Sequence, residues 1–243
     1  MNILEELKNQ VKNSNNIVFF GGAGVSTSSG IPDFRSATGL YNQKNKSNFS
    51  PEYMLSHEFF EKYPKDFMKY IKENLIYENV KPNAAHIGLS KLEKLGKLKG
   101  IITQNIDSLH QIAGSKNVVE LHGNLRDFYC VNCGRNYSFD DVKKLDYTIE
   151  CSECKGIIRP DVVLYGENLK EYNINKAVKL ISEADILIVG GTSLKVYPAA
   201  SFLKYYKGDK LVLINAERTD YDNMANYVFH EDIGEIISYL SDI

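Results

Sequence analysis

The sequence has little net charge and no long apolar stretch, and each shortage excludes a class of protein. Twenty-nine basic residues oppose 31 acidic ones in the 243-residue chain, which leaves a formal charge of −2 at pH 7. This balance gives no electrostatic reason to expect binding to nucleic acid or to an acidic membrane surface. No segment approaches the roughly 20 apolar residues that a membrane-spanning helix needs. We therefore expect neither a nucleic-acid partner nor a membrane.

The first ten residues are charged and helix-patterned, and they lack the apolar core of a signal peptide. Apolar residues make up 43% of the chain and charged residues 25%, a composition that can bury a sizeable core. These features favour a cytoplasmic globular protein. No long heptad repeat or large apolar patch suggests obligate assembly, so the sequence leaves the oligomeric state open.

Short runs of β-branched and aromatic residues alternate with helical stretches along most of the chain. The runs lie at 17–20, 100–103, 118–121, 162–165, 186–189 and 211–214. The helical stretches lie near 3–13, 83–95, 106–113, 174–184, 197–206 and 233–241. Runs that are apolar on both faces are typical of parallel strands covered by helices. The alternation predicts a doubly wound, mostly parallel α/β fold of the Rossmann-like type, whose ligands bind beyond the carboxyl ends of the strands.

Two segments interrupt this alternation. Residues 37–80 are rich in Tyr, Phe and Lys and predict a helical insert with its own aromatic core. Residues 124–159 contain all four cysteines. We therefore predict a Rossmann-like domain made of 1–36, 81–123 and 160–243, and a small domain made of the two interrupting segments.

The four cysteines form two pairs with metal-binding spacing. Cys130-x-x-Cys133 is followed, after 17 residues, by Cys151-x-x-Cys154. Two such pairs supply four thiolates that can close a tetrahedral shell around Zn²⁺. Disulfides are the alternative, and the lack of an export signal disfavours them. Because the protein fills every coordination position, we expect one structural zinc ion rather than a catalytic one.

A glycine-rich turn, residues 20–30, follows the first expected strand. Glycines allow backbone amides to approach a phosphate, and the N-terminus of the following helix favours an anion. The dinucleotide fingerprint is incomplete, because Thr27 stands where the third glycine is expected after Gly22 and Gly24. No acidic residue ends a second strand about 20 residues further on, which disfavours a hydride-transfer enzyme. A plain strand-to-helix turn remains an alternative.

Several polar residues at strand ends have ordinary structural interpretations when each is taken alone. A histidine at a strand end, such as His122, is more often structural than catalytic. Asn105 and Asp107 form a common helix cap. The segment 32–35 is compatible with a loop anchored by an aromatic side chain. The sequence motifs that surround these residues change these interpretations.

Seven segments, in order, resemble the signature motifs of the sirtuin family. They are GAGVSTSSGIPDFRS at 22–36, TQNIDSLHQIAG at 103–114, ELHG at 120–123, the cysteine pairs, RPDVVLYGE at 159–167, GTS at 191–193 with VYP at 196–198, and IN at 214–215. The resemblance extends from about residue 15 to the end of the chain. It is closest to the bacterial, undifferentiated class of sirtuins.

The resemblance implies an NAD⁺-dependent protein-lysine deacylase. In that family nicotinamide leaves NAD⁺, and the acyl group of an acyl-lysine protein or peptide moves to ADP-ribose. The ionising ribose needs nearby oxygen atoms and little water, and a later step needs a base, which a neutral imidazole supplies near pH 7. The catalytic residues implied are His122 as the base and Asn105, which positions a water molecule and the ribose. The NAD-binding residues implied are Ala23, Thr27, Asp33, Phe34, Arg35, Gln104, Asn105, Ile106, Asp107, His122, Thr192, Ser193, Asn215, Asp232 and Ile233.

The resemblance also implies a peptide-binding loop. A substrate backbone would add as a strand between two loops while the acyl-lysine enters an apolar tunnel. The residues implied are Val163, Leu164, Tyr165, Gly166, Glu167, Val196 and Tyr197. Tyr165 stands where many relatives carry Phe, which leaves the acyl preference open. Residues 37–41 lack the Tyr–Arg pair of relatives that prefer acidic acyl groups, so we expect short neutral acyl groups.

Two other functions use the same features. Interception of the ionised ribose by a protein nucleophile would make the chain a mono-ADP-ribosyltransferase. A catalytically inactive ADP-ribose-binding protein is the third alternative, and the presence of Asn105, Asp107 and His122 argues against it.

Overall fold

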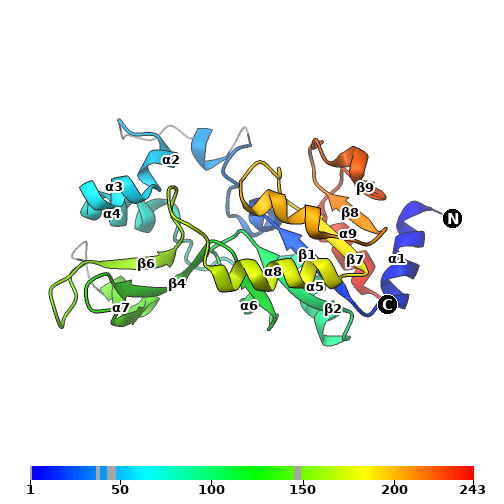
Figure 1. The fold of residues 1–243 in the computed structure, drawn as a ribbon, viewed down its shortest axis with the longest axis horizontal. Helices are drawn as coiled ribbons and strands as arrows, with labels where there is room; N and C mark the ends of the chain where they lie inside the picture. Colours follow the sequence, from blue (N-terminus) through cyan, green and yellow to red (C-terminus); the bar gives the residue numbers. More distant parts are fainter. Residues whose placement is uncertain (1, 37–38, 43–47, 145–148) are drawn as a thin grey trace.

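A six-stranded, fully parallel sheet forms the centre of the larger part of the molecule (Figure 1). The computed structural model describes residues 2–36, 39–42, 48–144 and 149–243. The strand order is β3-β2-β1-β7-β8-β9. The strands are β1 (Ile17–Gly21), β2 (Leu98–Thr103), β3 (Val118–Glu120), β7 (Ile186–Gly190), β8 (Leu211–Ile214) and β9 (Tyr227–Phe229). The predicted Rossmann-like parallel sheet is confirmed.

Helices cover both faces of this sheet, and alternate side chains of β1 point to opposite layers. Ile17 and Phe19 enter a core with α1 (Ile3–Asn13), α5 (Ala84–Lys94) and α9 (Ile233–Ser241). Val18 and Phe20 enter the opposite core. The covering elements there are α8 (Glu171–Glu183) and the 3₁₀ helix η3 (Ala199–Tyr205). Burial on both faces explains why these strands have continuous apolar sequences.

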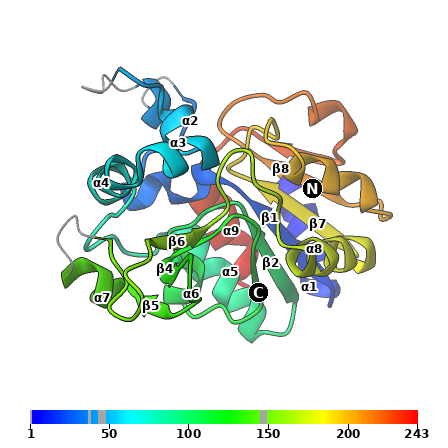
Figure 2. The same ribbon diagram turned by 60° about the vertical axis from the view of Figure 1, so that its left-hand side comes forward.

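A smaller antiparallel sheet, β5-β4-β6, lies beside the parallel one (Figure 2). Its strands are β4 (Gly123–Cys130), β5 (Asn136–Ser138) and β6 (Ile158–Val162). The helices near it are α2 (Pro51–Met54), α3 (His57–Lys62), α4 (Pro64–Asn74) and α7 (Phe139–Lys144). Phe59 and Phe67 from these helices share one buried core with Phe128 of β4. The aromatic residues of the helical insert therefore pack against the cysteine-bearing segment.

The strand that the sequence predicts at 162–165 does not join the parallel sheet. β6 ends at Val162 and pairs antiparallel with β4, because Gly123 and Val162 are register partners. Tyr165 makes only an isolated bridge to Ser56. Strand β9 had no sequence counterpart, and the helix expected over 106–113 is confined to α6 (Leu109–Ile112). Residues 37–38, 43–47 and 145–148 of the expected small domain lie outside the described residues.

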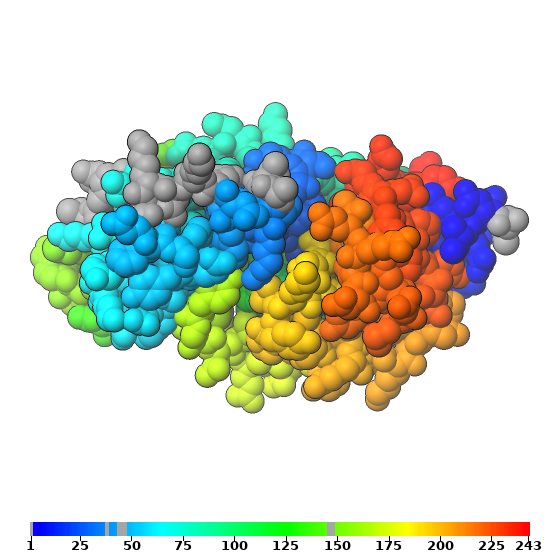
Figure 3. Space-filling view, turned by 90° about the horizontal axis from the view of Figure 1, so that it is seen from above, coloured from blue at the N-terminus to red at the C-terminus, as the bar shows by residue number. Residues whose placement is uncertain are grey.

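None of the helices in the described ranges is both long enough and apolar enough to span a bilayer. Figure 3 shows the helical insert, in blue to cyan, and the C-terminal segments, in orange to red, at opposite sides of one face. The yellow-green and yellow segments that follow β6 and β7 lie between them.

Candidate active site

The glycine-rich turn after β1 packs directly on the turn after β7. The Gly24 amide donates to the Gly191 carbonyl oxygen at 2.8 Å. A Cβ atom on Gly24 would lie 2.8 Å from the Gly191 Cα, so the close approach requires glycine. Gly24 lies in the 3₁₀ helix η1 (Ala23–Ser29), within the segment where the sequence predicts a glycine-rich turn that leads into a helix. Thr27 is exposed and its hydroxyl donates to the Gly24 carbonyl at 2.9 Å.

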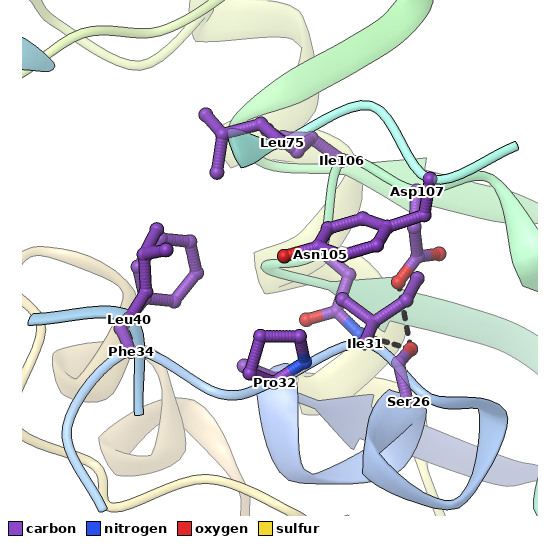
Figure 4. A pocket seen from close by; sticks show the side chains of 11 residues that line it. Ser26, Ile31, Pro32, Phe34, Leu40, Leu75, Asn105, Ile106 and Asp107 are labelled. Atoms are coloured by element: carbon purple, nitrogen blue, oxygen red, sulfur yellow. Dashed lines mark hydrogen bonds between the residues drawn. The ribbon is translucent and has the colours of Figure 1, made fainter. Parts of the chain in front are cut away.

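A pocket opens at the carboxyl ends of β1 and β2 (Figure 4). Five of the predicted NAD-binding residues line it: Ala23, Phe34, Asn105, Ile106 and Asp107. The other lining residues were not predicted, and they are Ser26, Ile31, Pro32, Leu40, Leu75 and Tyr77. Ser26, Ile31 and Pro32 lie inside the 22–36 motif, which was the available signal. Leu75 and Tyr77 come from the helical insert, where their apolar character suggested only a core.

Ser26, Asn105 and Asp107 form a hydrogen-bonded cluster at the base of this pocket. The Ser26 hydroxyl donates to Asp107 Oδ2 at 2.6 Å and accepts from Asn105 Nδ2 at 3.0 Å. Asp107 Oδ1 accepts the Leu109 amide at 2.9 Å in a side-chain turn just before α6, whose N-cap residue is Ser108 rather than the expected Asp107 or Asn105. Burial raises the pKa of Asp107 even though these hydrogen bonds oppose the shift. The cluster fixes both side chains and leaves the Asn105 carbonyl oxygen directed toward the pocket (Figure 4).

His122 follows β3, is not among the residues that line the pocket, and is held by a hydrogen bond to the residue before Asn105. Its Nδ1 lies 2.9 Å from the Gln104 carbonyl oxygen. Because a carbonyl oxygen only accepts, Nδ1 carries the proton, and Nε2 of the neutral ring retains a lone pair. Burial lowers the pKa of His122 while the bond to Gln104 opposes this shift. The ring is therefore a neutral base at physiological pH.

A second chain of hydrogen bonds runs from Gln104 along the carboxyl edge of the sheet, past the end of β7 to the end of β8. Gln104 Nε2 donates to Thr192 Oγ1 at 3.1 Å, and the Thr192 amide donates to Asn215 Oδ1 at 2.9 Å. Asn215 Nδ2 is buried and has no hydrogen-bond partner among the described residues. Ser193 is exposed at the same edge. A buried donor that lacks a protein acceptor suits a polar ligand here, such as the adenosine half of a dinucleotide.

Asp232 and Ile233 perform structural tasks at the start of α9. Asp232 Oδ1 caps this helix by accepting the Glu235 amide at 3.0 Å, and its other oxygen accepts Ser28 at 3.3 Å. Ile233 is buried in the core beneath β1 and β7. These two residues lie near the glycine turn, since Ser28 belongs to η1.

The loop that carries Asp33, Phe34 and Arg35 is shaped by a side-chain turn. Asp33 Oδ1 accepts the amides of Arg35 and Ser36 at 2.8 and 2.7 Å. This arrangement directs Phe34 to the pocket wall. The Asp33 carboxylate therefore bonds the backbone of its own loop.

The segment 163–167 is held from two sides. The Val163 amide donates to the His122 carbonyl oxygen at 2.9 Å, which links this segment to the catalytic candidate. Arg159 donates to both carboxylate oxygens of Glu167 at 2.6 and 3.0 Å. Burial raises the pKa of Glu167 most strongly, but the bonds from Arg159, the Leu164 amide and His57 together hold it below its ordinary value. The Glu167 carboxylate therefore holds the backbone of this loop in place through its bonds to Arg159 and the Leu164 amide.

The remaining residues predicted to bind peptide differ in their exposure. Tyr165 and Gly166 are exposed, Leu164 is buried, and Tyr197 is exposed in the turn before η3. Val196 is partly buried, and its carbonyl oxygen accepts the Ala200 amide at 2.9 Å.

The four cysteines converge at the far end of the antiparallel sheet. Their sulfur atoms all lie within 4.8 Å of one another, with 3.5 Å between Cys130 and Cys154 and 3.6 Å between Cys133 and Cys151. A tetrahedral zinc ion with bonds of about 2.3 Å places its sulfur ligands about 3.8 Å apart, so the cluster fits this metal. The Tyr137 hydroxyl, at 3.0 Å from the Cys151 sulfur, lowers the pKa of that thiol to about 6. The cluster is a four-cysteine zinc-binding site.

The parallel sheet, the glycine turn at its carboxyl edge and the separate cysteine cluster define a dinucleotide-binding α/β protein with a structural metal module. A family model described as the Sir2 family matches residues 22–198. The chain therefore belongs to the Sir2 family, the sirtuins.

Relatives and solved structures agree with this assignment over nearly the whole chain. The chain is 55% identical over 235 residues to the NAD-dependent protein deacetylase of Clostridium acetobutylicum, and the match covers 96% of each protein. It is 47% identical to that of Fusobacterium nucleatum, over 96% of this chain and 88% of the relative. A structure of Sir2 with a p53 peptide and NAD⁺ matches with a TM-score of 0.84 and 40% identity, over 98% of this chain and 96% of that one. A Sir2 variant with deacetylated p53 peptide and 3′-O-acetyl ADP-ribose matches with a TM-score of 0.89 and 39% identity, over the same shares.

Proposed function

We propose that this chain is an NAD⁺-dependent protein-lysine deacetylase that moves a short neutral acyl group from lysine to ADP-ribose and releases nicotinamide. One observation carries the proposal. A neutral imidazole is fixed through Nδ1 by the backbone carbonyl of Gln104, the residue that precedes Asn105 of the buried Ser26–Asn105–Asp107 cluster. This pairing supplies a base and a set of oriented polar groups at the carboxyl edge of a parallel sheet, where nucleotides bind.

Each predicted site residue has its own proposed role in the reaction. Ile106 and Asp107 would hold the nicotinamide amide, and the Asn105 carbonyl oxygen would stabilise positive charge on the ribose. Phe34 would cover the reactive face and exclude water. His122 Nε2 would then accept a proton from a ribose hydroxyl. Thr192, Ser193 and Asn215 would contact the adenosine end, with Ala23 and Thr27 near the pyrophosphate.

The proposed substrates are acyl-lysine proteins or peptides. The peptide backbone would add beside residues 163–167, opposite Val196 and Tyr197. The clamp between Arg159 and Glu167 supports this, because it holds the loop in an extended, partly exposed form. The zinc site would serve structure alone, and a reducing compartment such as the cytoplasm would keep its thiols available. The core shared by α3, α4, β4 and β6 supports grouping segments 37–80 and 124–159 as one small domain.

One assay separates this function from the two alternatives. The chain is incubated with NAD⁺ and an acetyl-lysine peptide, and nicotinamide, peptide and protein are followed together. Equal amounts of nicotinamide and deacetylated peptide are the expected result. ADP-ribose attached to protein without deacetylation would indicate a mono-ADP-ribosyltransferase, and binding without turnover would indicate an ADP-ribose-binding protein.

The pH dependence should reflect the buried environment of His122. A protonated imidazole cannot accept a proton, so activity is present above the pKa of this group and lost below it. Because burial lowers that pKa from 6.5, we expect kcat/KM to stay constant near neutrality and to fall only below pH 6.5. Measurement of kcat/KM across this range, with thermal melts to verify folding at each pH, tests the assignment. An acidic limb centred above 6.5 would be inconsistent with it.

The acyl preference follows from the groups around Tyr165. The nearby Arg35 guanidinium already bonds the Tyr165 hydroxyl and lies over the Tyr41 ring at 5.5 Å, so it is engaged within the protein. A buried carboxylate without a partner is costly, so we expect acetyl peptide to exceed succinyl peptide by at least about tenfold in kcat/KM. One peptide sequence with acetyl, butyryl and succinyl groups provides the comparison, and the neutral butyryl chain is the control for size. Faster turnover of the succinyl peptide would contradict the prediction.

A further inference from the structure

Three polar side chains bridge the pocket loop and the loop after β6. The hydroxyl oxygens of Tyr41 and Tyr165 lie 2.6 Å apart, and Arg35 Nη2 donates to the Tyr165 hydroxyl at 3.4 Å. A guanidinium only donates, so the Tyr165 oxygen accepts from Arg35 and shares a second bond with Tyr41. The two tyrosines are 124 residues apart in the sequence. We call this group the tyrosine bridge.

On one side the bridge is attached to the pocket wall. The Tyr41 amide donates to the Phe34 carbonyl oxygen at 3.0 Å, and the two rings pack with their centres 5.3 Å apart. Phe34 and the neighbouring Leu40 both line the pocket. Burial and the bond to Tyr165 raise the pKa of Tyr41 far above its ordinary value, so its hydroxyl stays protonated. The position of Tyr41 therefore affects the position of Phe34.

On the other side of the bridge, the loop after β6 that carries Tyr165 is held to the helical insert by backbone bonds. The Tyr165 amide donates to the Leu55 carbonyl at 3.0 Å, and the His57 amide donates to the Tyr165 carbonyl at 2.9 Å. These bonds do not involve the phenol. Replacing Tyr165 with phenylalanine would remove the bridge while the backbone of this loop keeps its attachments.

We infer that the tyrosine bridge is a positioning device that couples binding of the acyl-lysine peptide to binding of NAD⁺. The inference rests on the proposed function, which assigns residues 163–167 to the peptide and Phe34 to the ribose. Because the bridge joins these segments, a ligand that orders one of them reduces the cost of ordering the other. The coupling is reciprocal, so each ligand raises the affinity for its companion by the same factor.

The size of the coupling follows from the exposure of the bridge. Tyr165 is 40% exposed, so water competes for its hydroxyl and the bond has an ordinary net strength. A hydrogen bond of that kind corresponds to about a three- to tenfold change in affinity. The bridge therefore modulates affinity, and the chemistry itself depends on other residues.

The test measures peptide affinity on the full chain with and without a cofactor analogue. The Kd of an acetyl-lysine peptide is determined by calorimetry, alone and with saturating carba-NAD⁺, whose glycosidic bond does not ionise. The ratio of the two values is the coupling factor. We expect Tyr165→Phe to lower this factor about three- to tenfold, and because the factor is a ratio within one protein, any change in the Kd for peptide alone is divided out. Tyr41→Phe should also lower the factor, and the double variant should lose no more than Tyr165→Phe, because Tyr165→Phe already removes the bond between the two hydroxyls.

Tyr172→Phe is the matched control, since Tyr172 is an exposed tyrosine on α8 and should retain the wild-type coupling factor. Thermal melts identify any variant that is destabilised, and Tyr41→Phe provides a second route to the same bond. An unchanged coupling factor in both single variants, or additive losses in the double variant, would overturn the inference. If the wild-type chain deacetylates the peptide, such a result refutes only the bridge. A wild-type chain that releases no nicotinamide with acetyl-lysine peptide refutes the proposed function, and the coupling inference falls with it.

Discussion

Replacement of His122 by alanine is expected to lower kcat/KM for an acetyl-lysine peptide by about 10²–10⁴-fold, the usual cost of losing an acid–base group. The structure gives the reason. The Nδ1–H of His122 bonds the Gln104 carbonyl, so the ring presents Nε2 in the basic form. Alanine removes the base but leaves the Ser26–Asn105–Asp107 cluster intact. The measurement is steady-state kinetics with peptide and NAD⁺ varied separately.

The same variant offers an internal control for the assignment. Departure of nicotinamide precedes the step that needs the base, so exchange of labelled nicotinamide into NAD⁺ should persist when deacetylation is lost. An unchanged melting temperature would show that the fold is preserved. Deacetylation at a near-wild-type rate in the folded variant would remove His122 from its proposed role.

Removal of the metal is the second change with a large expected effect. Zinc bound to four thiolates contributes an apparent folding free energy of about 10–16 kcal/mol in small modules. A strong chelator, or Cys151→Ser, should therefore unfold the segment around the cluster. Activity should be lost as well, because β6 begins four residues after Cys154 and leads directly into the loop that contains Tyr165. Zinc content by atomic absorption, thermal melts and deacetylation are measured on the same samples.

A substitution between the ligands is the matched control for the metal experiment. Val131 is 42% exposed and lies between Cys130 and Cys133, so Val131→Ala should keep zinc, stability and activity. Full activity and an unchanged melting temperature in metal-free protein would contradict a structural role for the cluster.

The parallel sheet could be predicted from the sequence because its central strands are buried on both faces. β1 and β7 have no polar side chain, and their boundaries agree with the expected runs within a residue. The strand near Val162 was misassigned because an apolar run shows that a strand is buried but does not identify its partner. Its pairing with β4 depends on Gly123, whose φ of +74° allows the chain to turn beside Asp161. A contact of this kind between distant segments leaves no periodic signal.

The candidate site could be predicted where chemistry and motif coincide. The spacing of the cysteines predicted their convergence, and Ala23, Phe34, Asn105 and Asp107 do line one pocket. The pocket residues Leu75 and Tyr77 were missed because apolar side chains in a helical insert look the same whether they face a core or a ligand. The hydrogen-bond partners of individual polar groups could not be predicted from the sequence either. Examples are the bond from Arg159 to Glu167 and the bond between the Tyr165 and Tyr41 hydroxyls.

The most direct test of the account is a crystal structure of this chain with carba-NAD⁺ and an acetyl-lysine peptide. We expect the nicotinamide ring beside Ile106 and Asp107, the attached ribose within hydrogen-bond reach of His122 Nε2, and the acetyl oxygen facing that ribose. A dinucleotide bound away from the pocket that Asn105 and Asp107 line, or a ribose out of reach of His122, would contradict it.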